Sequence, residues 1–75
     1  MNKKRRKELR IALEHVSAAA HMVESILQEE QDAIDNWPEN LQGSDRYYDA
    51  EETQRHLEDL RDSLQEACEI ADNIL

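Results

Sequence analysis

The 75-residue chain contains no phenylalanine, and only one cysteine, one glycine and one proline. A single cysteine allows no disulfide within the chain and supplies too few ligands for a zinc site. One glycine is too few for a phosphate-cradling loop, and no serine lies in the glycine-rich elbow of a hydrolase. The composition therefore predicts no disulfide, no metal centre, no cofactor and no catalytic residues, in one small domain over residues 1–75.

The three histidines, His15, His21 and His56, also lack the spacing of metal ligands. No two of them follow a His-x-x-x-His pattern, and none follows the Glu-x-x-His pattern of di-metal helical bundles. Cys68 follows Ala67 in an apolar pattern and is expected to pack as a small apolar residue. We therefore expect a protein that is not an enzyme.

Charge is abundant but unevenly distributed, with a net charge of −9. Residues 1–10 carry six basic side chains against one acid, a net +5, whereas residues 11–75 carry three arginines against 17 acids, a net −14. An acidic body repels nucleic acid and anionic membranes, so we expect neither as a partner. No apolar run approaches the ~20 residues of a membrane span, and no secretory signal follows the basic start, so we expect a cytoplasmic protein.

Glycine and proline both fall between residues 36 and 45, and the long stretches on either side contain neither. Those stretches are rich in helix-forming residues. We predict a helix over about residues 3–35, a turn over 36–44 and a second helix over about 45–74, arranged as an antiparallel hairpin. In the turn, Pro38 is expected to open a short helical segment, Gly43 to take a positive φ, and Ser44 or Asp45 to cap the second helix.

Apolar residues recur every three or four positions in both halves, as on one face of a helix. In the first helix this seam comprises Leu9, Leu13, Val16, Ala20, Val23, Leu27 and Ile34, interrupted by Glu30. In the second helix we assign the seam to Ala50, Thr53, Leu57, Leu60, Leu64, Ala67, Ala71 and Ile74. A second row widens the apolar face of the first helix, and it comprises Ala12, Ala19, Ile26 and Ala33.

A lone two-helix hairpin covers only one side of each apolar face, while ordering the backbone costs ~1–2 kcal/mol per residue. We therefore predict an all-α antiparallel hairpin that self-associates, with a homodimer forming a four-helix bundle through the seam residues. Within each hairpin, the basic start of the first helix is expected to pair with the acidic end of the second. The pairs would join Lys3, Lys4 and Lys7 to Glu66, Glu69 and Asp72.

Three features of the sequence resemble those of a known group of proteins. They are the turn DNWPENLQGSDRY at residues 35–47, the basic segment NKKRRK at residues 2–7 and the acidic second helix. The chain resembles small acidic helical-hairpin proteins encoded by bacteriophages and mobile elements of Gram-positive bacteria. That resemblance implies a small accessory gene, of a kind that often encodes inhibitors of host defence or modulators of host enzymes. It implies no catalytic residues.

We expect the protein to bind and block, or modulate, a host protein through its acidic helical surface. The expected contact residues are Asp45, Arg46, Tyr47, Asp49, Glu52, Glu58, Asp59 and Asp62. A second hypothesis is an oligomeric sponge for a small nucleotide signal, with phosphates held by Lys3, Lys4, Arg5, Arg6 and Lys7. Trp37 or Tyr48 would stack on the base, although Trp37 and Leu41 are first expected to cover the end of the hairpin. A third hypothesis is a structural or assembly protein of a phage particle.

Overall fold

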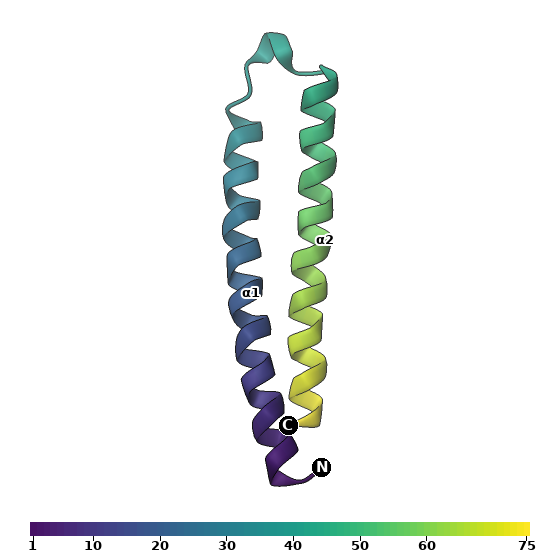
Figure 1. The fold of residues 1–75 in the computed structure, drawn as a ribbon. Coiled ribbons are helices and arrows are strands. Elements are labelled where there is room, and N and C mark those ends of the chain that lie inside the picture. The colour runs from purple at the N-terminus through teal and green to yellow at the C-terminus, as the bar shows by residue number, and fades with distance from the viewer.

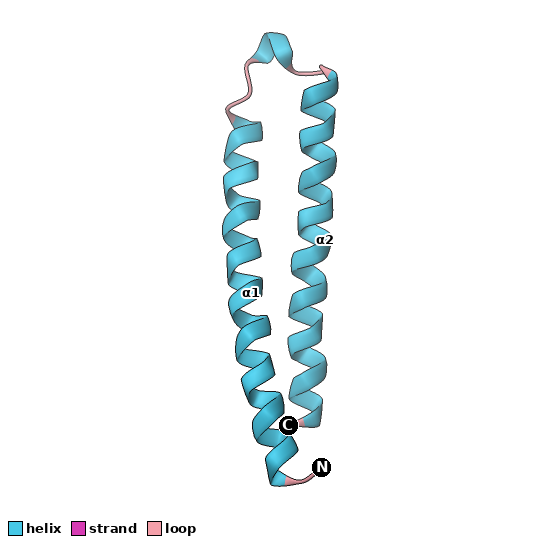
Figure 2. Cartoon of the chain, viewed as in Figure 1, coloured by secondary structure: helices cyan, strands magenta, loops and turns pink.

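The computed structural model describes all 75 residues and consists of two long antiparallel helices joined by a short turn (Figure 1). Helix α1 spans Lys3–Asp35, the 3₁₀ helix η1 spans Glu39–Leu41 and α2 spans Asp45–Ile74, with no strand (Figure 2). The molecule is a rod of 60 × 14 × 13 Å, one pair of helices thick. The predicted all-helical hairpin is therefore confirmed, and both helices occupy the ranges expected from the sequence.

A polar side chain caps the start of each helix. At α1 the Asn2 Oδ1 accepts a hydrogen bond of 2.9 Å from the backbone N–H of Arg5. At α2 the Ser44 Oγ accepts one of 3.3 Å from the backbone N–H of Tyr47. These bonds satisfy N–H groups that have no partner inside the helix, so the caps define where both helices begin.

Proline and glycine organise the turn. Helix α1 ends at Asp35, ahead of Pro38, because the residue before a proline is pushed out of the helical region. Pro38 then precedes η1, and Gly43 leaves the turn with φ of +90°, which favours glycine. Trp37 is half-buried against the end of the hairpin, as expected, whereas Leu41 is exposed. Leu41 belongs to η1, which lies at the tip of the turn beyond both helices (Figure 1).

The inner face of α1 follows the predicted seam. Leu27 and Ile34 are buried, and the other apolar members are half-buried, as is the interrupting Glu30. A hairpin one layer thick leaves even its best-packed side chains close to solvent, so only these two residues and Ala71 of α2 are buried.

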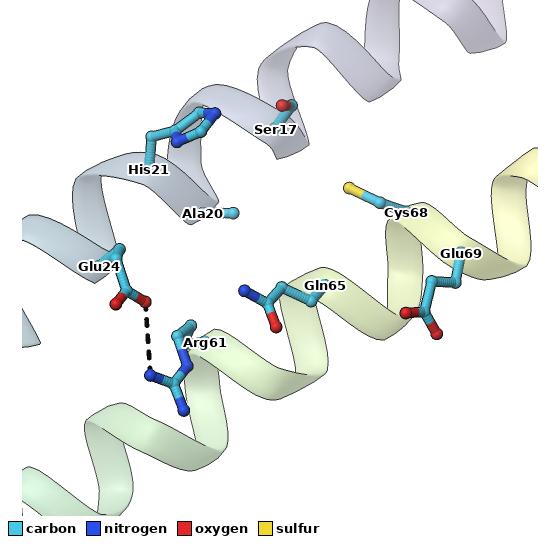
Figure 3. A pocket seen from close by; sticks show the side chains of 8 residues that line it. All are labelled: Ser17, Ala20, His21, Glu24, Arg61, Gln65, Cys68 and Glu69. Atoms are coloured by element: carbon cyan, nitrogen blue, oxygen red, sulfur yellow. Dashed lines mark hydrogen bonds and ion pairs between the residues drawn. The ribbon is translucent and has the colours of Figure 1, made fainter.

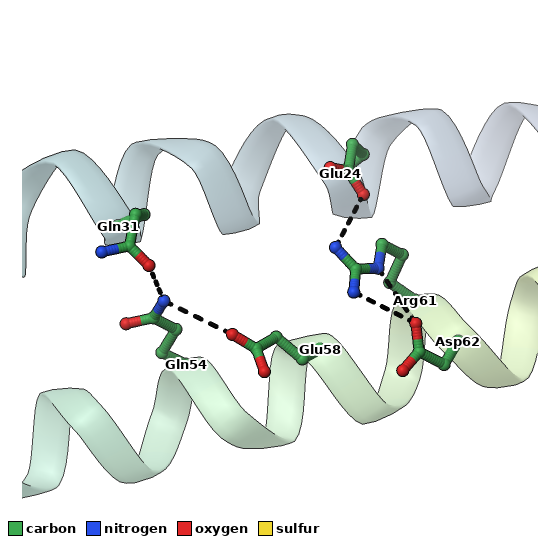
Figure 4. A network of polar contacts seen from close by, with 6 residues as sticks. All are labelled: Glu24, Gln31, Gln54, Glu58, Arg61 and Asp62. Atoms are coloured by element: carbon green, nitrogen blue, oxygen red, sulfur yellow. Dashed lines mark hydrogen bonds and ion pairs between the residues drawn. The ribbon is translucent and has the colours of Figure 1, made fainter.

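The inner face of α2 corrects the predicted seam in part. The structure keeps one half of it, Ala50, Leu57, Leu64 and Ala71. The other half is Tyr47, Gln54, Arg61 and Cys68, in place of Thr53, Leu60, Ala67 and Ile74, which are exposed. Both rows adjoin the shared half at helical spacing, so periodicity alone does not choose between them. The more polar row faces inward because its polar members find partners on α1: Gln54 meets Gln31, and Arg61 meets Glu24 (Figure 4).

These two contacts fix the register of the helices. They lie seven residues apart on each helix, in opposite directions along the chain. The same step continued places Arg10 level with Leu75, the last residue. Residues 3–7 therefore extend beyond the end of α2, as the amino-terminal end of the rod shows (Figure 1). We call Lys3, Lys4, Arg5, Arg6 and Lys7 the basic overhang.

The expected ion pairs between the basic overhang and Glu66, Glu69 and Asp72 are absent. The register explains why: those three acids lie level with residues well inside α1, while the basic overhang has no part of α2 beside it. Its positive charges also sit at the start of α1, where the helix dipole disfavours them and the first turn contains no acid.

Candidate functional site

Antiparallel packing sorts the remaining side chains onto two long sides of the rod. In such a pair, the rows that flank the inner face on one side of each helix lie together. One side is apolar. It consists of the residues that directly precede one inner row of each helix, together with Met22 and Ile70, which lie one row further from the inner face. We call it the apolar flank: Ala12, Ala19, Met22, Ile26 and Ala33 of α1, with Thr53, Leu60, Ala67, Ile70 and Ile74 of α2.

The apolar flank is open to solvent along most of its length. Met22 is 66% exposed and Ile70 is 55% exposed, and Ile26 and Leu60 lie level with each other in the middle of the rod. Large apolar side chains gathered on one side of a small protein mark an interaction surface more often than a solvated one. The α1 half of this surface is the second apolar row predicted from the sequence, whereas its α2 half contains the residues wrongly predicted to lie in the inner seam.

The opposite side is polar and carries an open depression of about 520 Å³ between the helices (Figure 3). Its lining comes equally from both helices: Ser17, Ala20, His21 and Glu24 from α1, and Arg61, Gln65, Cys68 and Glu69 from α2. The depression is thus lined by one arginine, two carboxylates, and small or other polar side chains. Across the whole chain, no group of three or more His, Cys, Asp or Glu side chains is arranged to hold a metal ion.

Arg61 is the only lysine or arginine that lines the depression, and the carboxylates of Glu24 and Asp62 already contact it. Its Nη1 lies 3.5 Å from Glu24 Oε2 on α1, and its Nη2 lies 3.1 Å from Asp62 Oδ1 (Figure 4). The hydrogen bond to Asp62, aided by the charge of Glu24, raises the pKa of Arg61 above its ordinary value. The guanidinium is therefore committed to a contact between the helices and is not offered to an anionic ligand.

The outer face of α2, turned away from α1, carries a row of carboxylates. Asp45, Glu52, Asp59 and Glu66 recur at seven-residue spacing and are all exposed. None of them forms an ion pair with a lysine or arginine, although Arg55 lies three residues after Glu52 and four before Asp59. The Nε2 of His56 lies 4.0 Å from Glu52 Oε1. We call these four residues the outer acidic row; at 1.5 Å per residue it extends about 30 Å along the rod.

The expected partner-contact residues are not all on this face. Asp45, Glu52 and Asp59 belong to the outer acidic row, and Glu66 extends it; its seven-residue spacing from Asp59 is visible in the sequence. The remaining five are distributed around α2. Asp49 lies toward the apolar flank, Asp62 and half-buried Glu58 lie toward the polar side, and exposed Arg46 is near the turn.

Tyr47 is not available as a free contact residue, because it faces inward at the end of the hairpin. Its ring meets Trp37 edge to face, with centroids 5.8 Å apart and planes at 72°. Tyr48 packs against Tyr47 in the same manner at 6.2 Å and remains mostly exposed. The three aromatic side chains thus form one cluster that closes the turn end.

The groups named for nucleotide binding lie far apart within one chain. The basic overhang is at the open end of the rod, whereas Trp37 and Tyr48 are at the turn end (Figure 1). With a long axis of 60 Å, one hairpin cannot bring them to the same ligand. A nucleotide site that used both would require a second copy.

Neither helix has an apolar stretch long enough to cross a bilayer. The chain matches no protein-family model, no curated protein and no solved structure. The hairpin itself offers three candidate interaction surfaces: the apolar flank, the outer acidic row and the basic overhang.

Proposed function

We propose that this is a non-enzymatic accessory protein of the phage type, which binds a host protein in the bacterial cytoplasm and blocks or modulates it. In this proposal it acts as a self-associated helical bundle, with a homodimer of hairpins as the working form. The binding surface is the outer acidic row of α2, together with the carboxylates beside it.

The observation that carries the proposal is the lack of basic partners along the outer acidic row. Carboxylates on a structural surface are commonly paired with lysine or arginine, but here no lysine or arginine forms an ion pair with any of the four acids, not even the neighbouring Arg55. A line of like charge costs some self-repulsion, and it attracts and orients a basic partner surface. A partner with a groove or ridge of lysine and arginine about 30 Å long fits this chemistry.

A charge-matched pair of variants tests the proposal. In the first, Glu52→Gln, Asp59→Asn and Glu66→Gln neutralise three members of the outer acidic row. In the control, Glu8→Gln, Glu14→Gln and Glu29→Gln make the same change in net charge with three exposed acids of α1.

Tagged wild type and both variants are used to capture proteins from host lysate, and the captured proteins are identified by mass spectrometry. We expect a host protein that is captured by the wild type and by the control, but not by the row variant, while circular dichroism shows equal helicity. Equal capture by the two variants, or no specific capture by the wild type, would refute binding through this row.

A further inference from the structure

We propose that the apolar flank is covered by a second copy of this chain turned end for end, so that the basic overhang of each copy lies beside the acidic turn of the other. The inference rests on the self-association proposed above and specifies which surface is used and in which direction the partner runs. Two independent features of the hairpin lead to it.

The first feature is the separation of charge along the rod. Residues 25–60, the half that contains the turn, hold eleven acids and two arginines, a net charge of −9. The two remaining segments, residues 1–24 and 61–75, hold seven acids and seven basic side chains, so the open half is neutral overall. Two copies side by side in the same direction would place both acidic halves together. A reversed pair instead sets each basic overhang against an acidic turn, which is the favourable electrostatic arrangement.

The second feature is the alternation of size along the apolar flank. Within one hairpin, Ile26 lies level with Leu60, and Ala19 lies level with Ala67. If two flanks meet with the hairpins in the same direction, α1 stacks on the partner's α2. In the two middle layers Ile26 then meets the partner's Leu60 and Ala19 meets the partner's Ala67, while Ala12 meets the partner's Ile74. Such a contact leaves voids at the alanine layers and crowding between them.

Reversal removes this conflict. The α1 row from Ala12 to Ala33 is centred next to Met22, and a two-fold axis at that level stacks α1 on the partner's α1 and α2 on the partner's α2. In the middle layers Ala19 then meets the partner's Ile26, and Leu60 meets the partner's Ala67, while Ala12 meets the partner's Ala33 nearer the ends of the contact. Large side chains opposite small ones interdigitate, as in a well-packed core. The contact is isologous, and both flanks are used up in a closed dimer.

The reversal also determines which part of the partner lies beside the basic overhang. Residues 3–7 lie about 17 positions from the axis, which brings them level with residues 38–42 of the partner, at its turn. The acids of that end, including Asp35, Glu39 and Asp45, are exposed. This contact gives the basic overhang the negative neighbours that it lacks within its own chain.

The first test uses exposure-matched variants and sedimentation equilibrium. Ile26→Gln with Leu60→Gln alters two flank residues that are 46% and 47% exposed. The control, Ile11→Gln with Leu75→Gln, alters two residues off the flank and away from the turn that are 47% and 39% exposed. We expect the dimer dissociation constant to rise at least about 100-fold in the flank variant, since two large side chains per chain lose their burial. The control should change it less than about threefold. Equal effects would refute the apolar flank as the interface.

The second test measures direction. A nitroxide spin label at Asn40→Cys, in a Cys68→Ala background, sits at the tip of the turn. Double electron–electron resonance should report about 50 Å between the two labels of a reversed dimer, from 1.5 Å per helical residue on each side of the axis. A dimer with a separation below about 25 Å would show that the turns lie together and would refute the reversal while preserving self-association. A monomer at every concentration tested, in both wild type and labelled protein, would refute self-association itself.

Discussion

Gln54 of α2 donates a hydrogen bond through its Nε2 to the Oε1 of Gln31 on α1, and this contact joins the two helices at a position where the heptad pattern calls for an apolar residue. Half-buried Glu30 lies beside it, and Gln54 also donates to Glu58 at 3.5 Å (Figure 4). One helical heptad away, Arg61 and Glu24 form the second polar layer. Polar layers in a helical seam fix register at some expense of stability, because a shifted alignment leaves their groups without partners.

A leucine in place of Gln54 should therefore stabilise the hairpin. We expect Gln54→Leu to raise the free energy of unfolding by about 1 kcal/mol, because a half-buried apolar side chain replaces an amide in the seam. Thermal unfolding at one fixed protein concentration, followed by circular dichroism, measures the change. Gln28→Leu on the exposed surface is the control and should shift stability by less than ~0.5 kcal/mol. A loss of stability in Gln54→Leu would show that the amide contact outweighs apolar burial here.

The cap of α2 gives a second prediction. Ser44→Ala removes the oxygen that accepts the Tyr47 N–H and should lower the free energy of unfolding by about 1 kcal/mol. Ser25→Ala, at an exposed position within α1, removes the same hydroxyl without removing a cap, and it should leave stability unchanged or slightly higher. Denaturant unfolding of the two variants at equal concentration compares them. Equal losses would mean that the Ser44 cap contributes nothing.

Gly43 should tolerate asparagine better than alanine. Its φ of +90° lies in a region that alanine rarely adopts, so we expect Gly43→Ala to cost about 1 kcal/mol of unfolding free energy. An added Cβ would lie 3.8 Å from the Tyr48 hydroxyl, an ordinary contact, so the loss comes from the backbone and not from a clash. Gly43→Asn should lose less, because asparagine accepts left-handed conformations more readily. Equal losses in the two variants would contradict a backbone origin.

Trp37 presents a buried polar atom without a partner. Its indole Nε1 is buried and makes no hydrogen bond, while its ring packs edge to face on Tyr47. Trp37→Phe should therefore keep stability within about 1 kcal/mol of the wild type, because the aromatic contact remains and the unpaired N–H is removed. Trp37→Ala should cost about 2 kcal/mol or more, since the ring is lost. Chemical unfolding followed at 222 nm tests both variants, and a larger loss for phenylalanine than for alanine would contradict this account.

Much of the fold could be predicted from the sequence because the chain has only two residues that break helices and both lie in the turn. The α1 seam was also predictable, since it carries the large residues Leu13, Leu27 and Ile34, whereas three of the four members of the second row are alanines. The α2 seam was not, because Ala50, Leu57, Leu64 and Ala71 belong equally to two rows. The choice depends on which side chains α1 offers opposite them. Gln31 and Glu24 satisfy the polar row, and this pairing across the turn is invisible in the periodicity of one helix.

The candidate surfaces likewise divide into one that the sequence predicts and two that it does not. The outer acidic row depends only on seven-residue spacing within α2, so most of its members were found from the sequence. The apolar flank depends on the correct α2 seam, and the basic overhang depends on the register of two helices of different length. Both therefore required the structure, and the pairing of Lys3, Lys4 and Lys7 with acids of α2 was wrong for that reason.

The overhang has a consequence for how the molecule comes apart. Isolated helical turns of this length are marginal in water, and within a single chain the helical hydrogen bonds and the Asn2 cap of residues 3–8 have no part of α2 packed beside them. Amide hydrogen exchange should therefore begin in this segment and advance along the helices toward the aromatic cluster at the turn end of the rod. Trypsin, which cleaves after lysine and arginine, would meet its preferred sites in the part of the chain that opens first.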